Sequence, residues 1–99
     1  MTTRKTRQKD TTLHSTLQVW RHIKAKYAET IVLVRKEDNY FTFGSDAEVV
    51  SIIMGIALEA NAAATSVCSL PHYRTENLLQ NIIKMGCSIA LCDPLKLSS

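Results

Sequence analysis

Four consecutive apolar residues, Ile31 to Val34, restrict the fold of this chain more than any other feature of its sequence. They belong to the run Thr30–Arg35, which is rich in β-branched residues and does not alternate polar with apolar side chains. A strand with one face in water alternates, whereas a strand that lacks alternation is covered on both faces. The run therefore predicts a central strand in a sheet that is packed on both sides.

Periodicity and turn residues predict the elements around this strand. Polar residues 36–39 are typical of a turn, and the aromatic run 40–44 after them completes a β-hairpin. Ser45 and Glu48 have capping-box spacing at the start of the second helix, and Gly55 and Gly86 are expected to end the second and third helices. Helices are expected over 13–27, 45–55 and 75–85. Further strands are expected over 56–58, 65–68 and 87–92. Pro71 should end the strand over 65–68, and the strand over 87–92 should be buried.

The predicted order is α-β-β-α-β-β-α-β. Helices and pairs of strands intermix without strict single alternation, which indicates an α+β fold with one small mixed β-sheet flanked by helices. Ninety-nine residues suit one such domain. We expect a basic flexible tail over residues 1–12, the folded domain over 13–94 and a short C-terminal tail over 95–99.

Positive charge is concentrated at the N-terminus. Residues 1–10 contain four basic residues and one acidic residue, while residues 11–99 contain eight of each, so the folded part is neutral. Duplex-binding domains draw most of their affinity from cationic contacts to phosphates, so only the first segment has the charge for nucleic acid. The alternative is a solvated, disordered terminus.

Sequence signatures of catalysis are missing. With three glycines, neither a Gly-x-Gly-x-x-Gly motif nor a P-loop can be written, so we expect no ATP bound by this chain. Cys68, His72, Cys87 and Cys92 could ligate zinc, but the last two cysteines face opposite ways on one predicted strand, and buried free cysteine is the alternative. His72 could serve Cys68 as a base, yet no nucleophile motif surrounds either residue. The prediction is a protein without enzymatic activity, metal or cofactor.

The cysteine count and the hydropathy pattern bear on the compartment. Three cysteines cannot all pair, which favours a reducing environment. The longest apolar stretch, residues 52–58, is far shorter than the roughly 20 residues of a membrane helix, and no apolar block follows the basic start as in a secretory signal. We expect a cytoplasmic protein with no membrane partner.

Three stretches of the sequence, taken in their order along the chain, resemble the N-terminal, mismatch-recognising domain of the MutS family of DNA repair proteins. Residues 27–35, with Tyr40 and the segment 43–47, are similar to the family's strand, turn and strand before its second helix. Residues 70–73 with Glu76 and Asn77 resemble its proline, aromatic and histidine turn followed by Glu-Asn, and residues 85–93 resemble its Gly-x-x-Val-Ala-Ile-Cys-Glu strand. The resemblance covers about residues 13–94 and implies a small mixed sheet with helices, in a DNA-repair context.

The resemblance also indicates where DNA would be read. In the family, a Phe-x-Glu pair in this hairpin meets the mismatch: the Phe stacks on a base from the minor groove and the Glu hydrogen-bonds it. The matching positions here carry Asn39 and Phe41, so the chain lacks the pair. Asn can hydrogen-bond a base edge, whereas Phe cannot replace a carboxylate acceptor. Phe41 is either a displaced wedge or, with Phe43, part of the core.

Two functions follow as hypotheses. The first is a stand-alone, non-enzymatic module that binds duplex DNA, matched or mismatched, weakly; the family's ATPase portions are expected to be absent. Its phosphate contacts would be made by Arg4, Lys5, Arg7, Lys9 and Arg35, and its base contacts by Asn39 and Phe41. The second is a protein-interaction or regulatory module, binding another chain or itself, that keeps the fold without DNA binding.

Overall fold

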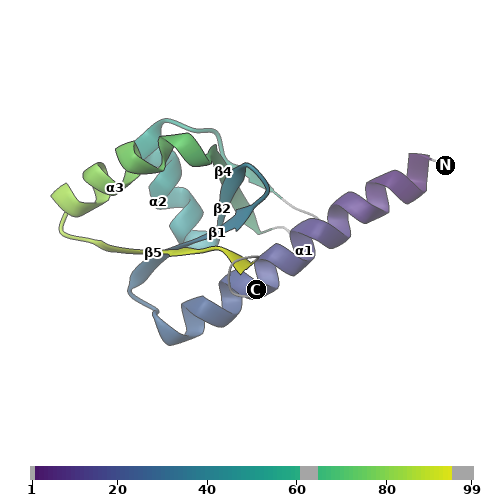
Figure 1. The fold of residues 1–99 in the computed structure, drawn as a ribbon, viewed down its shortest axis with the longest axis horizontal. Coiled ribbons are helices and arrows are strands. Elements are labelled where there is room, and N and C mark those ends of the chain that lie inside the picture. Colours follow the sequence, from purple (N-terminus) through teal and green to yellow (C-terminus); the bar gives the residue numbers. More distant parts are fainter. Residues whose placement is uncertain (1, 61–64, 95–99) are drawn as a thin grey trace.

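A mixed sheet of five strands, in the order β3-β4-β2-β1-β5, forms the middle layer of the molecule (Figure 1). The computed structural model describes the backbone of residues 2–60 and 65–94, and side chains from His14 onward. The elements are α1 (Thr2–Lys26), β1 (Thr30–Lys36), β2 (Asn39–Phe43), α2 (Gly44–Met54), β3 (Glu59–Ala60), β4 (Ser66–Pro71), the 3-10 helix η1 (His72–Arg74), α3 (Thr75–Lys84) and β5 (Ser88–Cys92). The α+β class and the element order predicted from the sequence are confirmed.

Strand β1 separates two hydrophobic cores. It pairs antiparallel with β2 and parallel with β5, and its residues 31–34 are all buried. Ile31 and Leu33 pack against α2 and α3 on one face, while Val32 and Val34 pack against Leu17 and other residues of α1 on the opposite face. Helices therefore cover both faces, as the unbroken apolar run predicts, although β2 and not β1 holds the middle position in the sheet.

Two side chains complete the hydrogen bonding of β1 where β2 turns away into α2. The pairing of β1 with β2 reaches Val34 opposite Phe41. Farther back along β1, the Val32 N–H donates to Asp46 Oδ2 at 3.1 Å, and Trp20 Nε1 donates to the Val32 carbonyl at 2.9 Å. Both backbone groups of Val32 are thus satisfied although the hairpin has ended, as burial requires.

A lysine at the end of α1 joins the same network. Lys24 Nζ lies 2.9 Å from Asp46 Oδ1 and donates to the Thr30 carbonyl at 2.6 Å. Asp46, in the first turn of α2, is 4% exposed. The carboxylate therefore connects the end of α1, the start of α2 and strand β1.

Several predicted boundaries are wrong. Helix α1 begins at Thr2 instead of residue 13, because residues 2–12 contain neither glycine nor proline to stop it. Ser45 lies inside α2; Phe43 is the N-cap, and no side chain within the described part of the chain caps this helix. β3 begins at Glu59, past the expected 56–58. β4 runs to Pro71, which can end a strand because a final residue need not donate to the ladder.

The predicted burial of strand β5 is also wrong. It was expected to be buried, but the structure places it at the edge of the sheet with no buried residue. Its only strand neighbour in the described ranges is β1. The glycines behave as predicted: Gly55 and Gly86 have φ of 67° and 78° at the ends of α2 and α3, and Cys87 N donates to the Ile82 carbonyl in a Schellman arrangement.

Candidate nucleic-acid interface

The β1–β2 hairpin ends in a two-residue turn. Lys36 pairs with Asn39 across the turn formed by Glu37 and Asp38. Glu37 has φ of 58°, in the left-handed region that favours glycine, and its carbonyl accepts a hydrogen bond of 2.9 Å from Arg35 Nε. The turn is therefore held in a defined shape by a side chain of the hairpin itself.

The two faces of the hairpin divide the residues that the sequence analysis grouped as a DNA site. Asn39 and Phe41 share the face that carries Phe43, toward α1. Arg35 stands on the opposite face, where its guanidinium carbon lies 6.0 Å from the centre of the Tyr40 ring. A ligand that lies flat on one face of the hairpin therefore cannot contact Arg35 together with Asn39 and Phe41.

Phe41 and Phe43 both turn toward the core beneath α1. Phe43 is fully buried, and its ring centre lies 5.9 Å from that of Trp20 in an edge-to-face arrangement. Phe41 is half-buried and packs against the same cluster. These contacts support the core alternative for Phe41 over a wedge that projects from the surface.

Asn39 occupies a different position from Phe41. It is half-exposed, is the first residue of β2, and pairs with Lys36 on one side and Pro71 on the other. Of the two residues that were predicted from the resemblance to contact bases, Asn39 is thus the one at the tip of the sheet.

A second turn lies beside this tip, and its residues were not predicted to contact DNA. His72 N donates to the Asp38 carbonyl at 2.9 Å, which attaches η1 to the hairpin turn. Tyr73 is 75% exposed, and Arg74 is half-buried next to it. The pairing of β4 with β2, which continues to Pro71 opposite Asn39, brings this turn to the hairpin, and no local pattern in the sequence predicts that pairing.

The side chains of Arg4, Lys5, Arg7 and Lys9 lie outside the described side chains, but the direction of their helix is defined. Trp20 contacts Val32, and Lys24, farther along α1, contacts Thr30, so α1 runs antiparallel to β1. The hairpin turn follows the end of β1. The chain therefore runs from Trp20 back toward its N-terminus on the side of the sheet where the hairpin turn lies (Figure 1).

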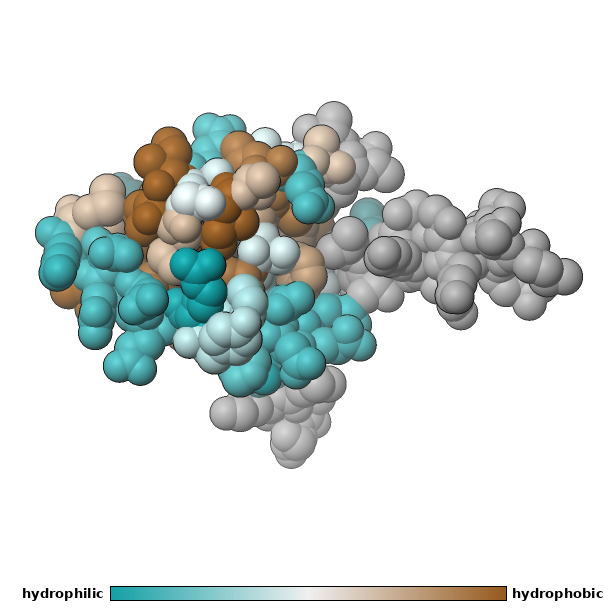
Figure 2. All heavy atoms as spheres, turned by 90° about the horizontal axis from the view of Figure 1, so that it is seen from above, coloured by the Kyte–Doolittle hydropathy of each residue, from teal (hydrophilic) through white to brown (hydrophobic). Residues whose placement is uncertain are grey.

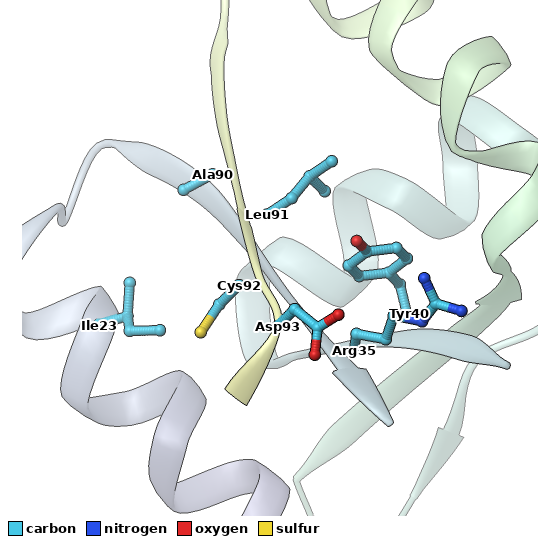
Figure 3. Close-up of a pocket in the computed structure, with 7 residues that line it drawn as sticks. All are labelled: Ile23, Arg35, Tyr40, Ala90, Leu91, Cys92 and Asp93. Carbon is cyan, nitrogen blue, oxygen red and sulfur yellow. The ribbon is translucent and has the colours of Figure 1, made fainter. Parts of the chain in front are cut away.

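An open pocket of about 390 Å³ lies at the far end of β5, where the edge strand passes β1. Figure 3 shows Arg35 and Tyr40 on one side of β5 and Ile23 with Cys92 on the other. The pocket wraps around the sheet edge and mixes apolar side chains with the charges of Arg35 and Asp93.

The cysteine and histidine candidates are apart in the structure. Cys68 is buried in the core, Cys92 is half-buried and Cys87 is exposed. In the described ranges, 2–60 and 65–94, no group of three or more potential ligands could hold a metal ion. Burial, with a smaller effect of Glu59, raises the pKa of the Cys68 thiol, which makes it a poor nucleophile. In the same ranges, no helix has the length and apolarity to cross a membrane.

Comparison with known proteins identifies the family. The protein-family model of MutS domain I matches residues 14–98. The chain belongs to the MutS domain I family. The DNA mismatch repair protein MutS of Flavobacterium psychrophilum is 35% identical over 84 residues, which cover 81% of this chain and 10% of the relative. The DNA mismatch repair protein MutS of Porphyromonas gingivalis is 40% identical over 78 residues, which cover 75% of this chain and 9% of the relative.

The resemblance noted in the sequence is therefore confirmed, and the family match covers the sheet and the helices around it. The chain spans about a tenth of the length of the curated relatives that it matches. Its similarity is to the domain I model, and the described site consists of a hairpin and an adjacent aromatic turn.

Proposed function

We propose that this chain is a non-enzymatic DNA-binding module of the MutS domain I type, in a DNA-repair context, that contacts duplex DNA with its hairpin end. The observation that supports the proposal is the position of Asn39: the residue that the resemblance suggests for base contact lies at the half-exposed tip of the sheet. The antiparallel course of α1 supports a contribution from the basic segment, which extends toward the same end. The chain binds no ATP and uses no cofactor.

Phosphate contacts supply the affinity in this proposal. Residues 4–9 contain four cationic side chains, and residues 11–99 are neutral, with eight basic and eight acidic residues. Four neutralised phosphates correspond to a slope of about −3.6 in a plot of log affinity against log salt, or roughly a 100-fold loss between 50 and 200 mM salt. Binding is therefore weak at physiological salt and depends mainly on the basic segment.

The test is a fluorescence anisotropy titration with matched and mismatched duplexes at low and moderate salt. The wild type is compared with a variant in which Arg4, Lys5, Arg7 and Lys9 are all replaced by glutamine, which keeps the helix length and removes the charge. We expect wild-type binding with the slope given above. In the variant, affinity at 50 mM salt falls strongly and the slope approaches zero.

Two further results define the role of the hairpin. A preference for the mismatched duplex that persists in the glutamine variant places base recognition in the hairpin, and deletion of residues 1–12 should preserve the same preference. Binding that is unchanged by the four substitutions contradicts the assignment of the basic segment. Absence of binding to any duplex at 50 mM salt contradicts the DNA function.

Exposed apolar groups favour a second candidate function, a protein-interaction or regulatory module. Ile52 on α2 is 82% exposed. Figure 2 shows apolar side chains gathered on the face of the molecule that is seen from above. The edge strand β5 has no charged residue, although natural edge strands commonly carry charges that prevent pairing with other chains. A stable dimer in light scattering that Ile52→Lys or Leu91→Lys dissociates, together with no DNA binding, supports this candidate over the first.

A further inference from the structure

Tyr73 is the most exposed of the phenylalanine, tyrosine and tryptophan side chains in the described part of the chain, at 75%. The preceding residue, His72, is held by two hydrogen bonds: its N–H donates to the Asp38 carbonyl at 2.9 Å, and its carbonyl accepts from Thr75 Oγ1 at 2.5 Å. The His72 ring lies edge-to-face with the Tyr73 ring, with 6.0 Å between the ring centres. A rigid turn thus presents an aromatic ring to solvent beside the hairpin tip.

The charges around Tyr73 bear on the kind of ligand that fits there. In the hairpin, η1 and the first turn of α3, three basic residues are balanced in number by three acidic ones: Arg35, Lys36 and Arg74 against Glu37, Asp38 and Glu76. Such a balanced surface has little attraction for the phosphate backbone, which needs a net positive field. A neutral planar group can approach it without electrostatic cost.

The neighbouring amide completes the arrangement. Asn39 pairs with Pro71, two residues before Tyr73, and is half-exposed. An Asn side chain offers both a donor and an acceptor, which is the combination that reads a base edge. An aromatic face with an amide nearby is suited to a nucleobase that has left its stack.

We propose that Tyr73 is a stacking platform for an unpaired nucleobase in DNA, with Asn39 at the border of the site. The proposal rests on the DNA-binding function proposed above and extends it to a residue outside the hairpin. Its ring is already exposed, so binding requires no rearrangement of the core. Loss of base stacking on an aromatic side chain reduces affinity by roughly 5- to 150-fold.

The experiment compares two duplexes, one fully paired and one with a single bulged base, at 50 mM salt. The variants are Tyr73→Ala, Tyr73→Phe, which keeps the ring, and Tyr27→Ala as a matched control. Tyr27 is 55% exposed but lies before β1, at the end opposite the hairpin turn. We expect Tyr73→Ala to weaken binding of the bulged duplex at least 5-fold without changing the paired duplex, and Tyr73→Phe and Tyr27→Ala to behave as the wild type.

A fluorescent base gives a second readout. With 2-aminopurine as the bulged base, stacking on Tyr73 quenches its emission in the wild type, and Tyr73→Ala abolishes this change. Urea midpoints followed by Trp20 fluorescence verify that the variants are folded. Equal weakening of both duplexes, or wild-type binding by Tyr73→Ala, overturns the stacking assignment while the DNA-binding function stands. Failure of the wild type to bind either duplex overturns both.

Discussion

Replacing Asp46 by alanine removes the group that completes the sheet where the hairpin ends. The 4% exposed carboxylate accepts the Val32 N–H at 3.1 Å and lies 2.9 Å from Lys24 Nζ. Alanine leaves a buried N–H without an acceptor, which costs about 1–3 kcal/mol, and leaves a half-buried cation without its acid. Breaking a fully buried pair costs about 3–5 kcal/mol, but Lys24 is 20% exposed and keeps the Thr30 carbonyl.

We therefore expect Asp46→Ala to lower the free energy of unfolding by about 3 kcal/mol, which corresponds to roughly 12–24 °C in Tm for a domain of this size. Asp46→Asn keeps one acceptor oxygen for Val32 and should lose about half as much. The measurement is urea unfolding followed by the fluorescence of Trp20, the only tryptophan, whose Nε1 donates to the Val32 carbonyl. Far-UV circular dichroism should give the same midpoint.

Glu48→Ala is the matched control, because Glu48 is an exposed carboxylate on the same helix. Its loss should change the stability by less than about 0.5 kcal/mol. If Asp46→Ala loses less than about 1 kcal/mol, or no more than Glu48→Ala, the bonds to Val32 and Lys24 do not have the role assigned to them.

Three further substitutions or reactions test other features. Thr42→Val should raise stability by about 1 kcal/mol in urea unfolding, because the buried Thr42 hydroxyl has no hydrogen-bond partner among the described residues; a loss of stability would contradict this. Glu37→Gly should add about 0.5–1 kcal/mol by relieving the φ of 58°. Burial chiefly raises the pKa of Cys68 and of Cys92, so both have little thiolate at pH 8, and mass spectrometry after brief alkylation should find label first on exposed Cys87.

Local patterns in the sequence were sufficient to predict the class and order of the elements. The unbroken run over 31–34 required cover on both faces, and the observed split of its side chains between two cores follows from the two-residue period of a strand. The polar turn at 36–39 and the glycines after α2 and α3 are local signals as well, and each lies where the backbone needs it.

Tertiary contacts decided the features that were missed. Asp46 reads as part of a capping box, yet its carboxylate bonds Val32, because β2 turns away into α2 at that point. The apolar composition of β5 suggests a buried strand, and only the strand order reveals it as an edge. Tyr73 belongs to the hairpin end through the β2–β4 pairing, which joins residues about 30 positions apart along the chain.

Phe41 and Tyr73 differ in the packing free energy that each would lose on contacting a base. Phe41 packs against the α1-side core, so projecting it outward exposes apolar area that contributes about 1–2 kcal/mol, comparable to the 1–3 kcal/mol that stacking on one base supplies. Tyr73 is exposed already and gives up little packing. Base contact through Tyr73 is therefore favoured over base contact through Phe41.

Phe41→Leu separates these two assignments, because leucine retains apolar packing and removes the aromatic ring. We expect a loss of about 1 kcal/mol in stability, from imperfect refilling of the core, and unchanged binding of the bulged duplex. The paired measurements are urea unfolding and the anisotropy titration, with Tyr73→Ala alongside. If Phe41→Leu weakens the bulged duplex as much as Tyr73→Ala was expected to, while Tyr73→Ala has no effect, the base contact belongs to the hairpin core face and the packing argument for Tyr73 fails.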